Sequence, residues 1–304
     1  MLVFIFSVLG LCVFEVVSSI DNAVINADIL STVSRPWRKW FLVWGLFFSV
    51  FLVRGLLPWL IVWLANPSLG PWQAFTASFS GDPSVHAAVE KSAPLLLIAG
   101  GIFLIFLFFY WLFLEDKNYS FTMEKFFHRQ GVWFFAVISI ILTIVIWEAL
   151  KRDSMLAFAA SVGSSIFFIT HGFKEQAAKA EMKLKQRSHQ SDIAKLLYLE
   201  VIDATFSIDG VVGAFAFTMS VPIIILGNGL GAVIVRQFTM KGVDRINDYP
   251  YLKNGAMYSI FFLGLIMLFE SFGVAVPHLA APIVTFVVIG YFFFKSRKAK
   301  NQKT

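Results

Sequence analysis

The sequence predicts an all-α polytopic membrane protein, on three observations. The 304-residue chain is 58% hydrophobic and 14% charged, whereas soluble domains carry roughly 25% charged residues. Its apolar residues fall into blocks of about 17–25, the length at which a helix crosses a bilayer. Most of its lysines and arginines lie in the loops between those blocks, the pattern that orients membrane helices.

Nine apolar blocks separated by polar breaks predict nine membrane spans. We expect them at residues 2–30, 38–64, 93–114, 131–150, 154–172, 195–218, 220–240, 253–271 and 277–295. With this count, the loops on one side hold nearly all the basic residues, and the other side holds Lys91, Lys151 and Arg152. Because basic loops stay inside, the N-terminus is predicted outside and the C-terminus in the cytoplasm.

The charged segment 173–195 is expected to be a partly helical cytoplasmic connector, with a partner-docking surface as the alternative. The single cysteine, Cys12, excludes a disulfide framework and a cysteine metal cluster. The basic residues follow the membrane loops, so the net charge of +6 argues for topology control rather than nucleic-acid binding.

Two apolar stretches carry the same acidic pattern. "FEVVSSIDN" holds Glu15 and Asp21, and "LEVIDATFSIDG" holds Asp203 and Asp209, six residues apart in both cases. Six residues advance a helix by about 9 Å and turn it by about 600°, which leaves the two side chains roughly 120° apart. Convergence on one ion then requires a break in each helix, so discontinuous helices are predicted at both stretches.

The acidic stretches belong to a longer internal repeat. Arg54 and Arg236 each lie about 16 residues into the span that follows the acidic one. We expect one transmembrane domain with a first repeat over 1–114, connecting spans over 115–194, and a second repeat with the last span over 195–296. An odd number of spans separates the copies, which inverts one against the other. Inverted repeats are typical of secondary transporters, which bind substrate near the bilayer midplane.

Charge balance predicts a bound cation. An ionised side chain at membrane depth costs about 3 kcal/mol, and the acids outnumber the two charge-balancing arginines, Arg54 and Arg236. These acids are Glu15, Asp21, Glu200, Asp203 and Asp209. Protons or a cation must neutralise the remainder; the alternative is that the acids pair with the arginines and only hold helices together. Oxygen ligands suit Mg²⁺, Ca²⁺ or Mn²⁺, with proton exchange as a natural counter-reaction.

Further polar residues are candidates for supporting roles. Asn22 offers a carbonyl oxygen beside Asp21, and Glu200 is a candidate fifth ligand or proton relay. Asn26 and Asp28 are candidates to line an inner vestibule, where they could bind metal or relay protons, with a solvated helix end as the alternative.

These motifs resemble the TerC family of bacterial integral membrane proteins, within the superfamily that includes lysine exporters. The resemblance rests on Glu15 with Asp21–Asn22, on Asp203 with "FSIDG", on Asn228 with Arg236, and on "YLKNGAMYSIFFLG" at 251–264. Gly210 stands where the family pattern has serine. The resemblance is weakest across 66–92 and 115–172.

The resemblance implies a manganese exporter of the bacterial inner membrane with a role in metal homeostasis and a historical tellurite-resistance label. It implies Glu15, Asp21, Asn22, Asp203 and Asp209 as ligands of the transported cation. We expect no enzymatic activity and no permanently bound cofactor. Two alternatives stay open: an exporter of a small organic cation or amino acid, and a non-transporting membrane scaffold. An intramembrane aspartyl protease is disfavoured because its Gly-x-Gly-Asp motif is absent.

Overall fold

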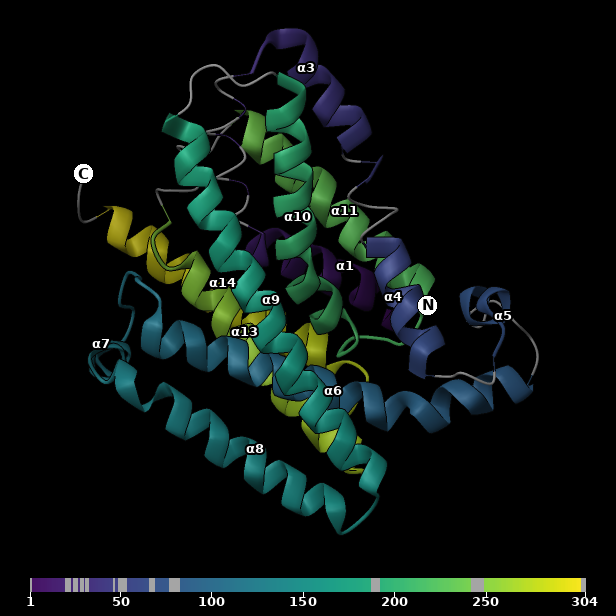
Figure 1. The fold of residues 1–304 in the computed structure, drawn as a ribbon. Helices are drawn as coiled ribbons and strands as arrows, with labels where there is room; N and C mark the ends of the chain where they lie inside the picture. Colours follow the sequence, from purple (N-terminus) through teal and green to yellow (C-terminus); the bar gives the residue numbers. More distant parts are fainter. Residues whose placement is uncertain are drawn as a thin grey trace.

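The computed structural model shows a bundle of helices (Figure 1). It describes residues 2–19, 23, 27, 30, 33–45, 47–48, 54–65, 69–76, 83–186, 192–241 and 249–301. Every regular element in these parts is helical, which confirms the predicted all-α polytopic membrane class.

The described residues form twelve α-helices and two short helical turns. In chain order they are α1 (Leu2–Ser18), α3 (Arg35–Trp40), a π-helical turn η1 (Phe41–Gly45), α4 (Arg54–Ala65), α5 (Pro71–Thr76), α6 (Pro83–Leu114), α7 (Thr122–Arg129), a 3₁₀ turn η3 (Gly131–Trp133), α8 (Phe134–Leu150), α9 (Ser154–Gln186), α10 (Asp192–Ala214), α11 (Val221–Lys241), α13 (Leu252–Ser271) and α14 (Ala280–Asn301).

Five helical stretches in the described residues are long and apolar enough to cross a membrane, and each overlaps a predicted span. They are Glu90–Leu114, Gly131–Leu150, Ser154–Lys174, Leu252–Ser271 and Ala280–Asn301. The apolar helices Leu2–Ser18 and Val221–Gln237 are shorter. The total of nine spans stays a prediction, because parts of 2–30 and 38–64 lie outside the described residues.

Two of the most extensive helix contacts join the predicted repeats. α6 lies along α13, and α1 lies along α11. Glycines bring α6 and α13 close: a Cβ on Gly101 would lie 3.1 Å from the carbonyl oxygen of Gly264. Small residues at such crossings let membrane helices approach closely. The repeat itself stays a prediction, but this packing places its two halves in direct contact.

α8 lies at the edge of the bundle (Figure 1) and packs mainly against α9. Its apolar side chains Phe135, Ile140, Ile144 and Trp147 are all exposed. An apolar helix with this much uncovered surface is suited to contact with lipid.

α9 does not end where the sequence predicted. The predicted span 154–172 continues without a break through Lys174 to Gln186, so much of the expected connector is helical, as predicted. Residues 187–191 lie outside the described residues, and α10 begins at Asp192. Lys174, expected in the connector, is therefore carried by the same helix as the apolar stretch.

α10 corrects the predicted broken helix of the second repeat. It is continuous from Asp192 to Ala214 and carries Glu200, Asp203 and Asp209 without interruption. Within it, the hydroxyl of Ser207 donates to the carbonyl oxygen of Asp203 at 2.5 Å. A break is not needed, because Asp203 and Asp209 have different partners and do not converge.

The end of α6 is closed by a lysine. Lys117 Nζ donates to the carbonyl oxygens of Trp111, Leu112 (3.0 Å) and Glu115 (2.9 Å) and lies 4.7 Å from the centre of the Trp111 ring. These are carbonyls that the last turn of a helix leaves without a backbone donor. Burial lowers the pKa of Lys117 from 10.5 to about 8, against the opposing pull of Glu115 and Glu124.

Candidate functional site

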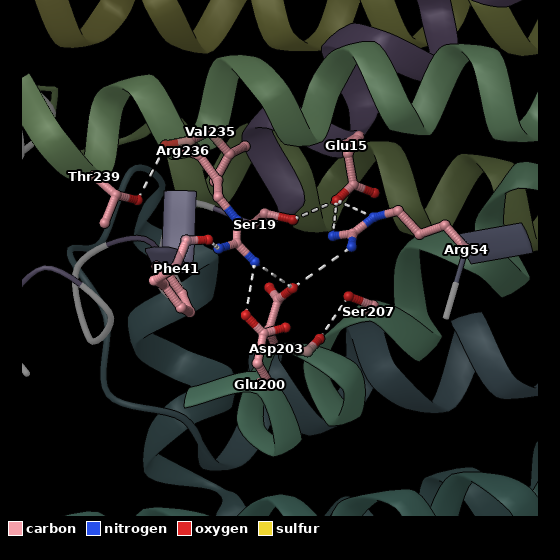
Figure 2. Close-up of polar contacts among 10 residues, drawn as sticks. All are labelled: Glu15, Ser19, Phe41, Arg54, Glu200, Asp203, Ser207, Val235, Arg236 and Thr239. Atoms are coloured by element: carbon pink, nitrogen blue, oxygen red, sulfur yellow. Dashed lines mark hydrogen bonds and ion pairs between the residues drawn. The ribbon is translucent and has the colours of Figure 1, made fainter. Parts of the chain in front are cut away.

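Five charged side chains from four helices meet inside the bundle (Figure 2). α1 provides Glu15, α4 provides Arg54, α10 provides Glu200 and Asp203, and α11 provides Arg236. We refer to these five residues as the charged cluster. Their meeting is a consequence of the packing of α1 along α11, with α4 and α10 beside them.

Glu15 and Arg54 form the tightest contact of the charged cluster. Glu15 Oε1 accepts from Arg54 Nη2 at 2.5 Å and from Arg54 Nε at 3.1 Å, and the hydroxyl of Ser19 donates to the same oxygen at 2.9 Å. The side chains of Glu15 and Arg54 are 1% and 2% exposed. Both side chains are almost inaccessible to solvent. Removing either one would leave the other as an uncompensated buried charge, which is strongly destabilising.

Asp203 lies between the two arginines. Its Oδ2 is 3.6 Å from Arg54 Nη1 and 3.7 Å from Arg236 Nη2 (Figure 2). These contacts are longer than charge-assisted hydrogen bonds, which are usually 2.7–2.9 Å. One carboxylate oxygen is thus shared between two guanidinium groups.

Arg236 is held mainly by Phe41, a residue of the predicted span 38–64. Its Nη1 donates to the carbonyl oxygen of Phe41 at 2.8 Å, and its guanidinium carbon lies 4.0 Å from the centre of the Phe41 ring. Its Nη2 is 3.3 Å from Glu200 Oε1. Phe41 begins the π-helical turn η1, a local widening that often occurs at functional sites.

Glycines make room for the buried carboxylates. A Cβ on Gly210 would lie 2.6 Å from Glu15 Oε2, and one on Gly231 would lie 2.6 Å from Glu15 Cβ. A Cβ on Gly45 would overlap Glu200 Oε1 and come within 2.8 Å of Arg236 Nη1. Where the TerC pattern has serine, Gly210 therefore leaves space that Glu15 occupies.

The charged cluster carries more negative than positive charge when all groups are ionised. Three carboxylates face two guanidinium groups, which leaves one negative charge in excess among these five residues. Around them the helices are largely apolar, so the excess is costly without a proton or a cation.

Asp209 lies apart from these contacts and pairs with a residue that sequence reasoning missed. Its Oδ2 accepts from Lys174 Nζ on α9, and the two side chains are 15% and 11% exposed. Lys174 was assigned to the connector because hydropathy falls after residue 172. The signal that could have found it is helical continuity, because no proline or glycine lies between Phe173 and Gln186.

Several predicted site residues lie outside the described residues: Asp21, Asn22, Asn26 and Asp28. The structure therefore does not test whether Asp21 approaches Glu15. Among the described residues, no group of three or more histidine, cysteine, aspartate or glutamate side chains is arranged to hold a metal ion. Glu15, Glu200 and Asp203 share neighbours, but arginine side chains lie between them.

The fold and the site define a polytopic helical membrane protein with a buried, net acidic cluster at the junction of four helices. The sequence profile of a family described as protein of unknown function (DUF475) matches residues 20–303. The chain belongs to this family. The matched region contains Arg54, Glu200, Asp203 and Arg236, whereas Glu15 precedes it.

A curated relative supports membrane location. The chain is 27% identical over 116 residues to the uncharacterized membrane protein YceF of Bacillus subtilis strain 168, over 36% of this chain and 44% of that protein. The chain thus spans less than half the length of this relative. No solved structure matches the chain. Neither match names the TerC family, so that resemblance stays a prediction.

Proposed function

We propose that this protein transports a cation across the membrane, with a divalent metal ion, Mn²⁺ foremost, as the substrate. The observation that carries the proposal is the excess negative charge of the charged cluster inside an apolar bundle. A set of ion pairs that served only to join helices would be expected to balance its charges, because unbalanced charge at this depth is costly.

The position of Asp203 supports a site that takes up a cation. Asp203 Oδ2 lies 3.6 Å and 3.7 Å from guanidinium nitrogens of two different arginines, so a cation bound there would compete with both ion pairs. Glu200 is 17% exposed, and its Oε1 lies 3.3 Å from Arg236 Nη2. Glu15, in contrast, is held tightly by Arg54, and we assign it mainly to positioning that arginine.

The oxygen-only chemistry favours a hard divalent cation. The cluster offers carboxylates and no thiolate or imidazole, and such donors suit Mg²⁺, Ca²⁺ and Mn²⁺. We propose that Asp21 and Asn22, which follow α1 in sequence, complete the ligand set at Asp203, and that Asp209 is a separate carboxylate position for the transported cation. Export, proton exchange and location in a bacterial inner membrane with a cytoplasmic C-terminus are part of the same proposal.

The test is metal flux in proteoliposomes, with Mn²⁺, Mg²⁺, Ca²⁺ and Zn²⁺ supplied in turn. We expect wild-type vesicles to move Mn²⁺ at least tenfold faster than empty vesicles, and Asp203→Asn and Asp21→Asn to abolish that flux. Glu148→Gln is the matched control, because Glu148 is a half-exposed carboxylate paired with Lys151 at the end of α8. Equal flux in wild-type, Asp203→Asn and Asp21→Asn vesicles would contradict the proposal.

A small organic cation is the second candidate, and one observation favours it. In the described residues the carboxylates of the cluster already bind guanidinium groups of the protein, so an arginine- or lysine-like substrate would be recognised by the same chemistry. Flux of radiolabelled arginine or lysine with no Mn²⁺ flux, again lost in Asp203→Asn, would select this candidate over the metal.

A further inference from the structure

Lys174 and Asp209 form a second buried charge pair that the charged cluster does not include. Lys174 Nζ on α9 pairs with Asp209 Oδ2 on α10. Both side chains are mostly buried, at 11% and 15% exposure, so removing either charge would leave the other less compensated.

Asp209 retains unused binding capacity. Its Oδ1 is buried and has no hydrogen-bond partner among the described residues, although Oδ2 is paired with Lys174. A buried carboxylate oxygen without a donor is unfavourable, and more so when the group is charged. Oδ1 is therefore a buried acceptor with which a cation at this carboxylate could interact.

The pair lies at the border of the charged cluster. Asp209 is six residues after Asp203 on the continuous helix α10, about 9 Å along its axis and roughly 120° around it. Its neighbour Gly210 is where α10 approaches Glu15, since a Cβ there would lie 2.6 Å from Glu15 Oε2. Two carboxylates of α10 therefore have different partners. Asp203 lies near Arg54 and Arg236, and Asp209 pairs with Lys174 of α9.

We propose that Lys174 is a tethered counter-ion, whose ammonium group occupies a cation position at Asp209 until the transported cation displaces it. The inference rests on the proposed function and assigns a role to α9, which lies outside both predicted repeats. Displacement frees the lysine and so connects occupancy of the site to the contact between α9 and α10.

A purely structural pair makes a different prediction from a tethered counter-ion. If Lys174 only joins α9 to α10, its removal leaves Asp209 uncompensated and weakens the fold without improving cation binding. If Lys174 competes with the cation, its removal leaves a site with one more negative charge. The second case predicts tighter binding, by about tenfold for one charge removed a few ångströms away.

The first arm of the experiment measures MnCl₂ binding to purified full-length protein by calorimetry. We expect Lys174→Gln and Lys174→Met to lower the Kd for Mn²⁺ about tenfold, and Lys151→Gln to leave it unchanged. Lys151 is the matched control because it pairs with Glu148 on the exposed surface of α8, where both side chains are 51% exposed. Unchanged or weaker binding in folded Lys174 variants would overturn the inference and leave the proposed function standing.

The second arm uses the wild-type protein, so it does not depend on the folding of a variant. Acetic anhydride modifies exposed amines, and mass spectrometry reads the extent at each lysine. We expect saturating MnCl₂ to raise modification of Lys174 several-fold while that of Lys151 stays constant. Bound Mn²⁺ with no change at Lys174 would overturn the inference. Absence of Mn²⁺ binding to wild-type protein would instead overturn the metal proposal, and the inference with it.

Discussion

At the scale of single residues, the ion pairs of the charged cluster differ in length. Glu15 and Arg54 are nearly inaccessible and joined by contacts of 2.5 Å and 3.1 Å. Asp203 and Glu200 lie 3.3–3.7 Å from arginine nitrogens. Removing one partner of the Glu15–Arg54 pair is expected to destabilise the fold, and Asp203 and Glu200 are expected to contribute most to cation binding.

Replacing Arg54 should therefore destabilise the protein strongly. Arg54→Met leaves Glu15 buried without its main counter-charge, and breaking a buried pair in this way costs about 3–5 kcal/mol. The measurement is the free energy of unfolding in detergent titrated with SDS. Lys151→Met is the control, because its exposed pair with Glu148 is worth at most about 1 kcal/mol. Equal stability of the two variants would show that the Glu15–Arg54 contact has little energetic weight.

At the scale of the helices, continuity decides which side chains meet. The predicted break in α10 is absent because Asp203 and Asp209 are compensated on different faces, by arginines and by Lys174. α9 continues past the apolar stretch and thereby brings Lys174 to Asp209. α6 ends after Leu114, where Lys117 binds the last carbonyl groups.

Lys117, at the end of α6, makes the folding stability of the protein depend on pH. Burial lowers the pKa of Lys117 to about 8 in the folded protein, against 10.5 in the unfolded chain. Between these values the unfolded chain binds more protons at this residue, so its contribution to folding stability rises with pH. Below about pH 8 Lys117 is protonated in both the folded and the unfolded protein, so the cost of burying its charge lowers the folding stability in full.

The contribution of Lys117 to the pH dependence of stability is measured by comparing the Tm of wild type with that of Lys117→Gln. We expect the Tm of wild type, relative to that of the variant, to increase as the pH is raised from 7 to 10. A Tm difference that stays constant over this range, or that falls, would contradict the assigned pKa. The same scan on Lys151→Gln supplies the control for general effects of alkaline pH.

At the scale of the whole molecule, hydropathy and loop charge predicted the class of protein and most of its long helices. α6, α8, α13 and α14 begin or end within a few residues of the predicted spans on at least one side. This succeeds because a bilayer imposes length and apolarity on each span, whatever that span packs against.

The site was harder to predict, for physical reasons that particular residues illustrate. The sequence pointed to all five members of the charged cluster, Glu15, Arg54, Glu200, Asp203 and Arg236, because charges at membrane depth are informative by themselves; their role as a site stays a prediction. The sequence did not show that Arg54 lies between Glu15 and Asp203, nor that Lys174 neutralises Asp209. Those facts depend on helix rotation and tertiary packing, which spacing along the chain does not determine.

The central claim is that the net acidic cluster at the junction of α1, α4, α10 and α11 binds a divalent cation. Electron paramagnetic resonance measures it directly, because free Mn²⁺ gives a sharp six-line signal that is lost on binding to the protein. We predict that purified wild-type protein removes about one equivalent of that signal and that Asp203→Asn removes none, while Glu148→Gln behaves as wild type. A free Mn²⁺ signal that wild type leaves undiminished, or that Asp203→Asn removes equally well, would contradict the claim.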